Sequence, residues 1–347
     1  MHHLRYLIAA LCSSLCLTAH ADQVTLKNGD TLTGKIVSKS GKVLTFKTDY
    51  AGSLKIKWDK IDTLSTDQPV AALLKGDQYV NARVQPAAGD KPDQSATQSS
   101  SPPKNQQPPI SDLDSILYIN PTPEESGRGY RYVGRANLAV SDNSGNSNNQ
   151  QVHADGEIQK RAKSYRYTLG GEINSARDNR ESSVSNSRAY ASYDSFYTAT
   201  DFLYVHGALE NDKFRDIKLR SLGGVGYGYQ VYDSETTNLS IKGGPDMVNI
   251  AHYAAPSEDF IALGWHVDFK HKLARIPAEM FHVQDGYRGL SNGNSDIMLK
   301  TRTGLRIPLS GGLTATAQYN VDWENHPTPG LGTIDRQLLL GLSYIYE

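Results

Sequence analysis

Two histidines and an aspartate occur close together in the segment 265–271, and such residues can bind metal ions or transfer protons. His266 and Asp268 are two residues apart, so in a strand their side chains point to the same face. His271 has the opposite parity and lies at the end of the segment. The other histidines and the serines show no spacing that singles out a nucleophile and its base. We therefore expect these side chains to fill a polar interior, and the sequence predicts no catalytic residue, no metal ligand and no cofactor.

A glycine-rich run at residues 223–228 (GGVGYG) has the composition of a loop that binds phosphate groups. Such a loop requires a strand before it and a helix after it. Here the alternation typical of a strand continues on both sides of the glycines. We expect the glycines to permit curvature or close approach of neighbouring strands, and no nucleotide site is predicted.

The elements that must position these residues are strands, and their pattern is clearest in the C-terminal segment 311–346. Between residues 313 and 324, odd-numbered residues are apolar or aromatic and even-numbered residues are polar. Residues 338–346 alternate with the same period. Each segment is long enough for a tilted strand to cross a bilayer. No apolar run after residue 21 approaches the length of a membrane-spanning helix.

Twelve strand candidates of this kind follow one another to the end of the chain. They are predicted at 129–141, 150–161, 163–175, 187–198, 201–211, 216–232, 236–249, 258–271, 275–284, 295–308, 311–324 and 333–346. An even number is typical of bacterial barrels and places both chain ends on the periplasmic side. Pro245 lacks a backbone N–H group, so a bulge is expected there. The fold class predicted is all-β, a C-terminal antiparallel transmembrane β-barrel of about twelve strands preceded by a small SH3-like or Sm-like β domain.

Loop length and aromatic placement orient this barrel. Connections after odd-numbered strands are long and polar, for example 142–149, 177–186 and 285–294, and the others are short. Aromatic residues on the apolar faces gather at the end with the short turns, which is typical of a membrane girdle. They are Tyr130, Tyr132, Tyr165, Tyr167, Tyr193, Tyr197, Tyr227, Tyr229, Phe269, Tyr344 and Tyr346, with Trp323 at the opposite rim.

The opposite strand faces carry charges of both signs, which we expect to line the lumen. The candidates are Arg135, Asp155, Glu157, Arg166, Glu172, Arg220, Asp268, Lys300, Arg302, Arg306, Asp322 and Glu324. One interpretation is a salt-bridged interior that packs the barrel shut, and the other is an aqueous pore. Barrels of about eight strands are filled by side chains whereas those of about sixteen hold channels, so twelve strands leave both open. The basic series on strand 295–308 would favour anions if a pore is open.

The chain before the barrel has three predicted parts. Residues 1–21 have the features of a secretory signal peptide and contain both cysteines, so the mature chain has no thiol. Residues 22–85 show short alternating strands and an Asn28-Gly29 hairpin turn, which predicts a small periplasmic β domain. Residues 86–128, rich in Pro, Ser and Gln in their first part, are predicted to be a linker and lead-in to the outer-membrane barrel of residues 129–347.

Charge and export bear on the partners of the small domain. An Sm-like unit can bind RNA, but the formal net charge of -1 and the secretion signal predict no nucleic-acid partner. The lysines of residues 27–57 are typical of a solvated face. The alternative is contact with cell-wall polymer or with acidic lipid.

Several motifs resemble the YdiY-like salt-induced outer-membrane proteins, a family with a domain of unknown function (domain of unknown function 481). In the barrel they are residues 144–150 (SGNSNNQ), 222–229 (LGGVGYGY) and 237–245 (TNLSIKGGP), and the resemblance covers roughly 129–346. Residues 24–30 (VTLKNGD) and 47–52 (KTDYAG) resemble the small β domain found ahead of such barrels. The resemblance implies this architecture and an outer-membrane location, and it implies no reaction.

The sequence therefore favours a non-enzymatic outer-membrane protein that acts as a narrow pore or in envelope integrity. The expected partners are outer-membrane lipid and the barrel-assembly machinery. One alternative is a barrel enzyme that acts on lipid or cell-wall material. Another is a soluble secreted β protein that binds a ligand.

Overall fold

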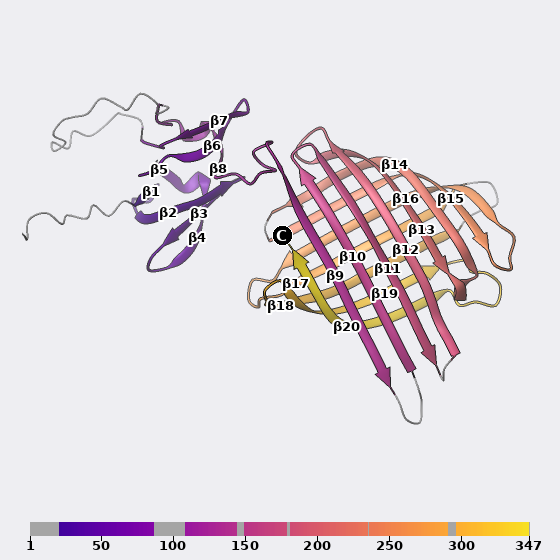
Figure 1. The fold of residues 1–347 in the computed structure, drawn as a ribbon. Helices are drawn as coiled ribbons and strands as arrows, with labels where there is room; N and C mark the ends of the chain where they lie inside the picture. Colours follow the sequence, from indigo (N-terminus) through magenta and orange to yellow (C-terminus); the bar gives the residue numbers. More distant parts are fainter. Residues whose placement is uncertain are drawn as a thin grey trace, which may run out of the picture. The chain divides into compact units, whose positions relative to one another are not determined.

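The computed structural model describes residues 21–86, 108–143, 149–178, 181–234, 236–290 and 296–346 (Figure 1). The predicted signal peptide, most of the Pro/Ser/Gln-rich segment and the motif at 144–148 lie outside these ranges. The chain divides into two compact units, one ending at Ser126 and one beginning at Gly127. Within the described ranges, no helix has the length and apolar character needed to cross a membrane.

The first unit is an eight-stranded β domain. Its elements are β1 (Asp22–Leu26), β2 (Thr31–Ser40), β3 (Val43–Thr48), β4 (Gly52–Lys57), η1 (Trp58–Lys60), β5 (Ile61–Ser65), β6 (Val70–Leu74), β7 (Gln78–Ala82), η2 (Leu113–Ser115) and β8 (Ile116–Ile119). The predicted hairpin turn joins β1 to β2, and its Gly29 has a φ of 91°, which glycine adopts without strain. Strand order is β4-β3-β2-β8-β6-β7, and β1 pairs with β2 and β5.

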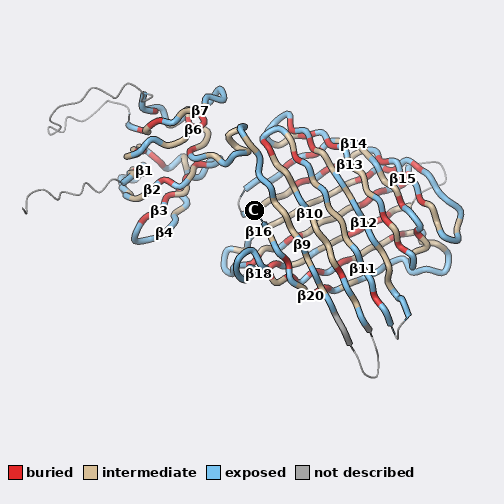
Figure 2. Tube along the Cα trace, viewed as in Figure 1, coloured by how far each residue is buried: buried red, intermediate tan, exposed pale blue. Residues whose placement is uncertain are grey.

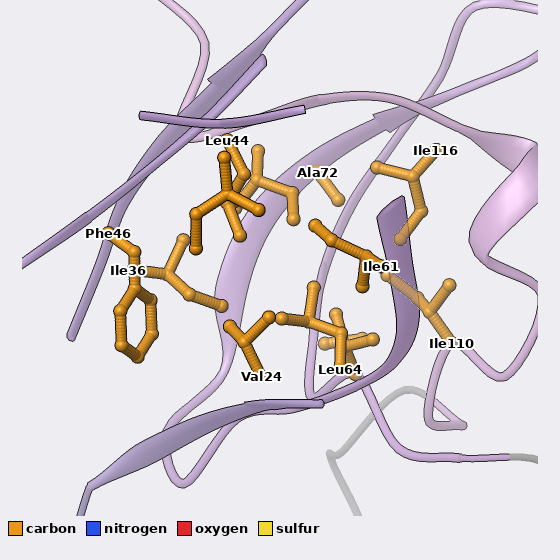
Figure 3. Packing of buried hydrophobic residues seen from close by; sticks show 13 residues of the cluster. Val24, Ile36, Leu44, Phe46, Ile61, Leu64, Ala72, Ile110 and Ile116 are labelled. Atoms are coloured by element: carbon orange, nitrogen blue, oxygen red, sulfur yellow. The ribbon is translucent and has the colours of Figure 1, made fainter. Parts of the chain in front are cut away.

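The core of this domain is apolar and continuous (Figure 3). Val24, Leu44 and Phe46 are fully buried and pack with residues from every part of the sheet. Ile110 and Ile116 belong to the same cluster, although they follow the Pro/Ser/Gln-rich segment in sequence. The domain thus extends past its predicted end at residue 85.

The segment predicted as linker and lead-in, 86–128, is in part a strand-forming segment of this domain. Ile110 donates its N–H to the Arg83 carbonyl at 2.8 Å, and Gln85 donates to the Ile110 carbonyl at 3.0 Å. β8 then pairs with both β2 and β6. Burial of its isoleucines outweighs the cost of ordering this stretch. Residues 87–107 are therefore an insertion within the domain, and residues 127–129 connect the domain to the barrel.

The second unit confirms the predicted barrel: its described residues form twelve antiparallel strands closed into a ring. They are β9 (Tyr130–Asn143), β10 (Asn149–Ala162), β11 (Tyr165–Asp178), β12 (Glu181–Phe196), β13 (Asp201–Asp212), β14 (Ile217–Asp233), β15 (Thr237–His252), β16 (Glu258–Lys272), β17 (Glu279–Gly289), β18 (Ile297–Ser310), β19 (Leu313–Glu324) and β20 (Ile334–Tyr346). η3 (Lys213–Arg215) lies between β13 and β14. β20 pairs with β9 and closes the ring.

Several local predictions differ from the structure. The expected loop at 177–186 is mostly strand, because β11 and β12 stay paired as far as Asp178 and Glu181. The ninth barrel strand is β17, which begins at Glu279 and so leaves Pro277 in the preceding turn. It continues to Gly289, so the first half of the loop expected at 285–294 is strand. β15 keeps one register with β16 through Pro245, so the expected bulge is absent from that pairing.

Exposure alternates along the barrel strands (Figure 2). The outer surface carries large apolar side chains that a soluble monomer would bury, such as Leu169 at 60%, Met247 at 65% and Leu340 at 69% exposed. Polar side chains take the opposite face, as in Thr316, Gln318 and Asn320, which are all buried. An apolar outer wall around a polar interior is the arrangement of a membrane-spanning barrel.

Candidate functional site: the barrel interior

The interior of the barrel is crossed by ion pairs that join opposite walls. Among the described residues, four pairs connect strands five places apart in the ring of twelve. They are Glu210 of β13 with Lys300 of β18, Glu172 of β11 with Arg302 of β18, Arg188 of β12 with Asp285 of β17, and Arg220 of β14 with Glu324 of β19. Side chains from such strands meet only if they point into the lumen, so these pairs identify the inner face directly.

Their geometry also determines the cross-section of the barrel. Twelve strands about 4.8 Å apart and tilted by about 40° would close a circular barrel roughly 24 Å across. One arginine and one glutamate side chain cannot bridge that width. The ring is therefore flattened, and its two broad walls approach closely enough for the side chains to meet.

The end of the lumen nearest η3 is closed by a buried charge network. The ammonium group of Lys300 donates to Glu210 at 2.6 Å and to Asp322 at 3.0 Å. Arg220 contacts Glu324 at 2.5 Å, and Arg215 reaches the other oxygen of the same carboxylate at 2.7 Å. Cations and carboxylates alternate, so each buried charge faces an opposite one.

The middle of the lumen is bridged by two arginines. Arg302 binds Glu172 through two nitrogens, at 2.6 and 3.2 Å, which is the fork geometry that arginine offers to a carboxylate. Arg188 donates to Asp285 at 3.0 Å, and His266 contacts the other oxygen of that carboxylate at 2.6 Å. Such charge-assisted contacts hold the two walls together.

A second buried cluster lies at the aromatic-girdle end of the lumen. Asp194 is fully buried and lies between Arg166 at 2.6 Å and Lys242 at 2.7 Å. Phe196 and Phe202 pack beside it, with ring centroids 4.7 Å apart. The cluster joins β11, β12, β13 and β15, so one side of this end is packed solid.

A smaller group on β9, β10 and β11 completes the lining. Arg135 and Asp155 form an ion pair, and His153 lies between Asp155 at 2.9 Å and Asn174 at 2.6 Å. His153 is only 2% exposed. Neither nitrogen of this ring is available to a ligand in the lumen, because both already have partners.

The lumen also contains a cavity of about 160 Å³, which reaches from the girdle-end cluster to the middle of the lumen. Its lining includes Tyr190, His206, Asp246, His266 and Asp268. A water molecule occupies about 30 Å³ in the liquid, so the cavity has room for about five waters.

The structure places the sequence-predicted lumen residues on the inner face in every case. Arg135, Asp155, Glu157, Arg166, Glu172, Arg220, Asp268, Lys300, Arg302, Arg306, Asp322 and Glu324 share strand parity with the crossing ion pairs. The basic series of β18 does not form a cationic stripe, because each member has a carboxylate partner. Lys300 pairs with Glu210, Arg302 with Glu172, and Arg306 with Glu279 at 2.8 Å.

The predicted girdle residues take the opposite parity. Tyr130, Tyr132, Tyr165, Tyr167, Tyr193, Tyr197, Tyr227, Tyr229, Phe269, Tyr344 and Tyr346 lie on the outer parity at the end with turns 163–164, 197–200 and 311–312. Trp323 lies on the outer face near the other end. Several rings touch, such as Tyr167 and Tyr193 with centroids 4.7 Å apart.

The residues first considered for chemistry are not brought together. His266 faces the lumen and binds Asp285, whereas His271 lies on the outer parity and contacts the Thr237 hydroxyl at 2.8 Å. Over the described ranges, no group of three or more His, Cys, Asp or Glu side chains is arranged to hold a metal ion. Glycines 224, 226 and 228 lie on the inner parity, where Asp246, Tyr204 and Phe202 fill the space that a side chain would need. They serve close packing, as the sequence indicated.

Sequence reasoning missed several members of the interior network, among them Arg188, Asp194, Lys242 and Asp285. Alternation along the strands could have identified two of them. Asp194 follows a tyrosine assigned to the outer face and Lys242 follows the outward Ile241, so both side chains are expected to point inward. Arg188 lay at the edge of its predicted strand, and Asp285 lay just beyond the end of the predicted ninth strand.

Comparison with solved structures finds outer-membrane barrels at low identity. A bacterial polysaccharide outer membrane secretin matches with a TM-score of 0.33 and 9% identity, over 63% of this chain and 98% of that chain. The translocator domain of the autotransporter NalP from Neisseria meningitidis matches with a TM-score of 0.33 and 13% identity, over 62% and 88%. The β domain of the Bordetella autotransporter BrkA matches with a TM-score of 0.28 and 10% identity, over 63% and 98%.

No curated protein matches the chain. The family model described as protein of unknown function, DUF481, matches residues 136–346, which is nearly all of the barrel. These residues are more than half of the chain, so the protein belongs to the DUF481 family.

Proposed function

We propose that the protein is an outer-membrane barrel with a closed lumen, and that it contributes to envelope integrity by holding its small β domain at the periplasmic face of the membrane. The observation that carries this proposal is the set of four ion pairs between opposite walls. An ion would have to displace these pairs at more than one level to pass. The proposal assigns no enzymatic reaction to the protein.

The orientation follows from the girdle and from the chain ends. Both ends of the barrel, Tyr130 and Tyr346, lie at the tyrosine-rich end, as do the turns of two residues at 163–164 and 311–312. Short turns and chain ends face the periplasm in bacterial barrels. The small domain, which precedes Tyr130, would then be periplasmic.

A narrow pore is the second candidate, and the polar internal cavity favours it. Conduction would require the charge networks at both ends of the cavity to rearrange. The two candidates therefore differ in one measurable property, the conductance of the resting protein.

Planar-bilayer recording of the purified mature protein tests the proposal. We expect no sustained conductance from the wild type. The double variant with Glu172→Ala and Arg302→Ala removes both partners of one ion pair, so no unpaired charge is left in the lumen. We expect this variant to produce transient current. The matched control is Lys218→Ala with Asp259→Ala, two exposed charges outside the lumen, which should stay silent. Steady single-channel conductance of the wild type would overturn the closed barrel in favour of the pore.

A further inference from the structure

One exposed sheet face of the small domain is strongly basic. β2, β3 and β4 are adjacent, and their outward positions carry Lys35, Lys47, Lys55 and Lys57. Lys42 extends the row at the turn between β2 and β3. These three strands contain no aspartate or glutamate.

The placement of two of these lysines is unfavourable within the domain itself. Lys35 and Lys47 are direct cross-strand partners, so their side chains leave the same face side by side, and both are exposed. Like charges directly opposite each other in a sheet are destabilising. An anion bound between them would remove this repulsion.

The domain as a whole is not basic. The lysine face therefore reflects an uneven distribution of charged residues over the domain. Acidic residues occur elsewhere, and several are held by backbone groups of their own domain. Asp22 accepts hydrogen bonds from the N–H groups of Ile36 and Asp67, and Glu125 accepts from Ser40 and Thr122. Within the described hairpin of β3 and β4, the only acidic residue is Asp49, at its tip.

The same hairpin tip presents an aromatic ring to solvent. Tyr50 is 73% exposed, and the turn that carries it is held by Thr48, whose hydroxyl accepts from the Ala51 N–H at 3.0 Å. Val37 and Val43 are also exposed on the lysine face. An exposed tyrosine and aliphatic side chains among lysines match the chemistry of a lipid headgroup layer, which combines anionic groups with an apolar boundary.

We propose that this face, through Lys35, Lys47, Lys57 and Tyr50, docks on the anionic headgroups of the membrane that contains the barrel. The covalent connection favours lipid over a soluble anion or a cell-wall polymer. Only residues 127–129 separate the domain from β9, and three residues span about 10 Å at most. Tyr130, the first residue of β9, belongs to the girdle at headgroup level. The tether thus gives anionic lipid a high effective concentration at the domain. This inference goes beyond the closed-barrel function and does not depend on it.

Fluorescence quenching in nanodiscs tests the docking. The mature protein contains no cysteine if residues 1–21 are removed, so Ser53→Cys places a single fluorophore on the lysine face. A second protein, Asp62→Cys, places it on β5 as a reference. Each is reconstituted in discs of phosphatidylcholine alone, or of phosphatidylcholine with an equal amount of phosphatidylglycerol, with a nitroxide quencher on the headgroups. We expect quenching at position 53 to rise about threefold or more in the anionic discs and to fall at high salt.

Two matched double variants distinguish an effect of the lysine face from an effect of the total charge of the domain. Lys35→Gln with Lys47→Gln should abolish the anionic-lipid effect, and it relieves a repulsion, so the domain should remain folded. Lys60→Gln with Lys75→Gln removes the same charge from exposed positions outside the face and should leave the effect intact. Equal quenching in both lipids would overturn the proposal. A fluorophore at position 53 that becomes shielded from solvent when acidic cell-wall fragments are added, but does not respond to anionic lipid, would overturn the proposal in favour of a polymer partner.

Discussion

Asp194 is the residue on which the girdle end of the lumen most depends. Its carboxylate has no solvent exposure and neutralises two cations, Arg166 and Lys242. Removal of one member of a buried charge cluster leaves the others uncompensated, which costs about 3–5 kcal/mol. We expect Asp194→Asn to lower the free energy of unfolding from lipid vesicles by this amount.

The control for Asp194→Asn is Asp335→Asn, at a carboxylate whose side chain is 64% exposed and contacts Arg215 only at 3.5 Å. Exposed ion pairs contribute at most about 1 kcal/mol. Similar losses in the two variants would mean that the Asp194 cluster is hydrated rather than buried.

Lys39 makes the stability of the small domain depend on pH. Its ammonium group donates to the carbonyl groups of Ile116 and Leu117 and lies 4.7 Å from the centre of the Trp58 ring. Burial lowers the pKa of Lys39 from 10.5 to about 8. Between these two values the unfolded chain binds the proton that the folded domain has released, so stability rises as pH increases from about 8 to 10.5.

This dependence can be isolated by comparison with Lys39→Met, which keeps the apolar stem and removes the titrating group. The unfolding free energies of both proteins are measured by near-ultraviolet circular dichroism. Between pH 8 and 10.5, the unfolding free energy of the wild type should increase relative to that of the variant. A difference that stays constant from pH 8 to 10.5 would show that Lys39 remains charged in the folded domain.

At the scale of elements, β8 shows that the small domain includes residues beyond the Pro/Ser/Gln-rich segment. It supplies Ile116 and Ile119 to the core and pairs with β2 and β6, although residues 87–107 separate it from β7. Limited proteolysis within 87–107 should therefore produce two fragments that stay associated in native buffer and separate only in denaturant. Size-exclusion chromatography distinguishes this from release of a free fragment.

A truncation provides the control for that digestion. A fragment of residues 22–126 should give a cooperative thermal transition, whereas residues 22–85 lack three core isoleucines and should not. A folded 22–85 fragment would show that β8 is an accessory strand.

The strand elements explain where sequence reasoning succeeded. Period-two alternation on a lipid-facing wall is a strong signal, and the twelve strands and their faces follow from it. The signal weakens outside the bilayer, where both faces are polar. Residues 177–178 and 181–186 show this, because their backbone ladder continues although the apolar alternation has ended. A composition rich in Pro, Ser and Gln likewise predicted a linker, but a few isoleucines beyond it carried the chain back into the core.

At the scale of the whole molecule, closure of the barrel predicts resistance to detergent. The described barrel strands leave no free edge, and ion pairs add connections across the ring. We expect the unboiled protein in sodium dodecyl sulfate to keep a folded barrel and to migrate differently from the boiled protein. Identical migration would argue against a closed membrane barrel.

The partners within the lumen could not be predicted from the sequence. Parity assigns Arg302 and Glu172 to the interior, but their contact depends on the flattening of a ring in which they lie five strands apart. Flattening is a collective property of all twelve strands, and no single segment encodes it. The sequence thus predicted which charges line the lumen and left open whether they close it.

The insertion at residues 87–107 has a practical consequence. The chain leaves and re-enters the small domain at positions joined by backbone hydrogen bonds between Arg83, Gln85 and Ile110. Because the two ends are already adjacent, the length of a foreign sequence inserted between them is not restricted by the domain. A fluorescent protein or an epitope inserted at this point would report the location of the domain in living cells.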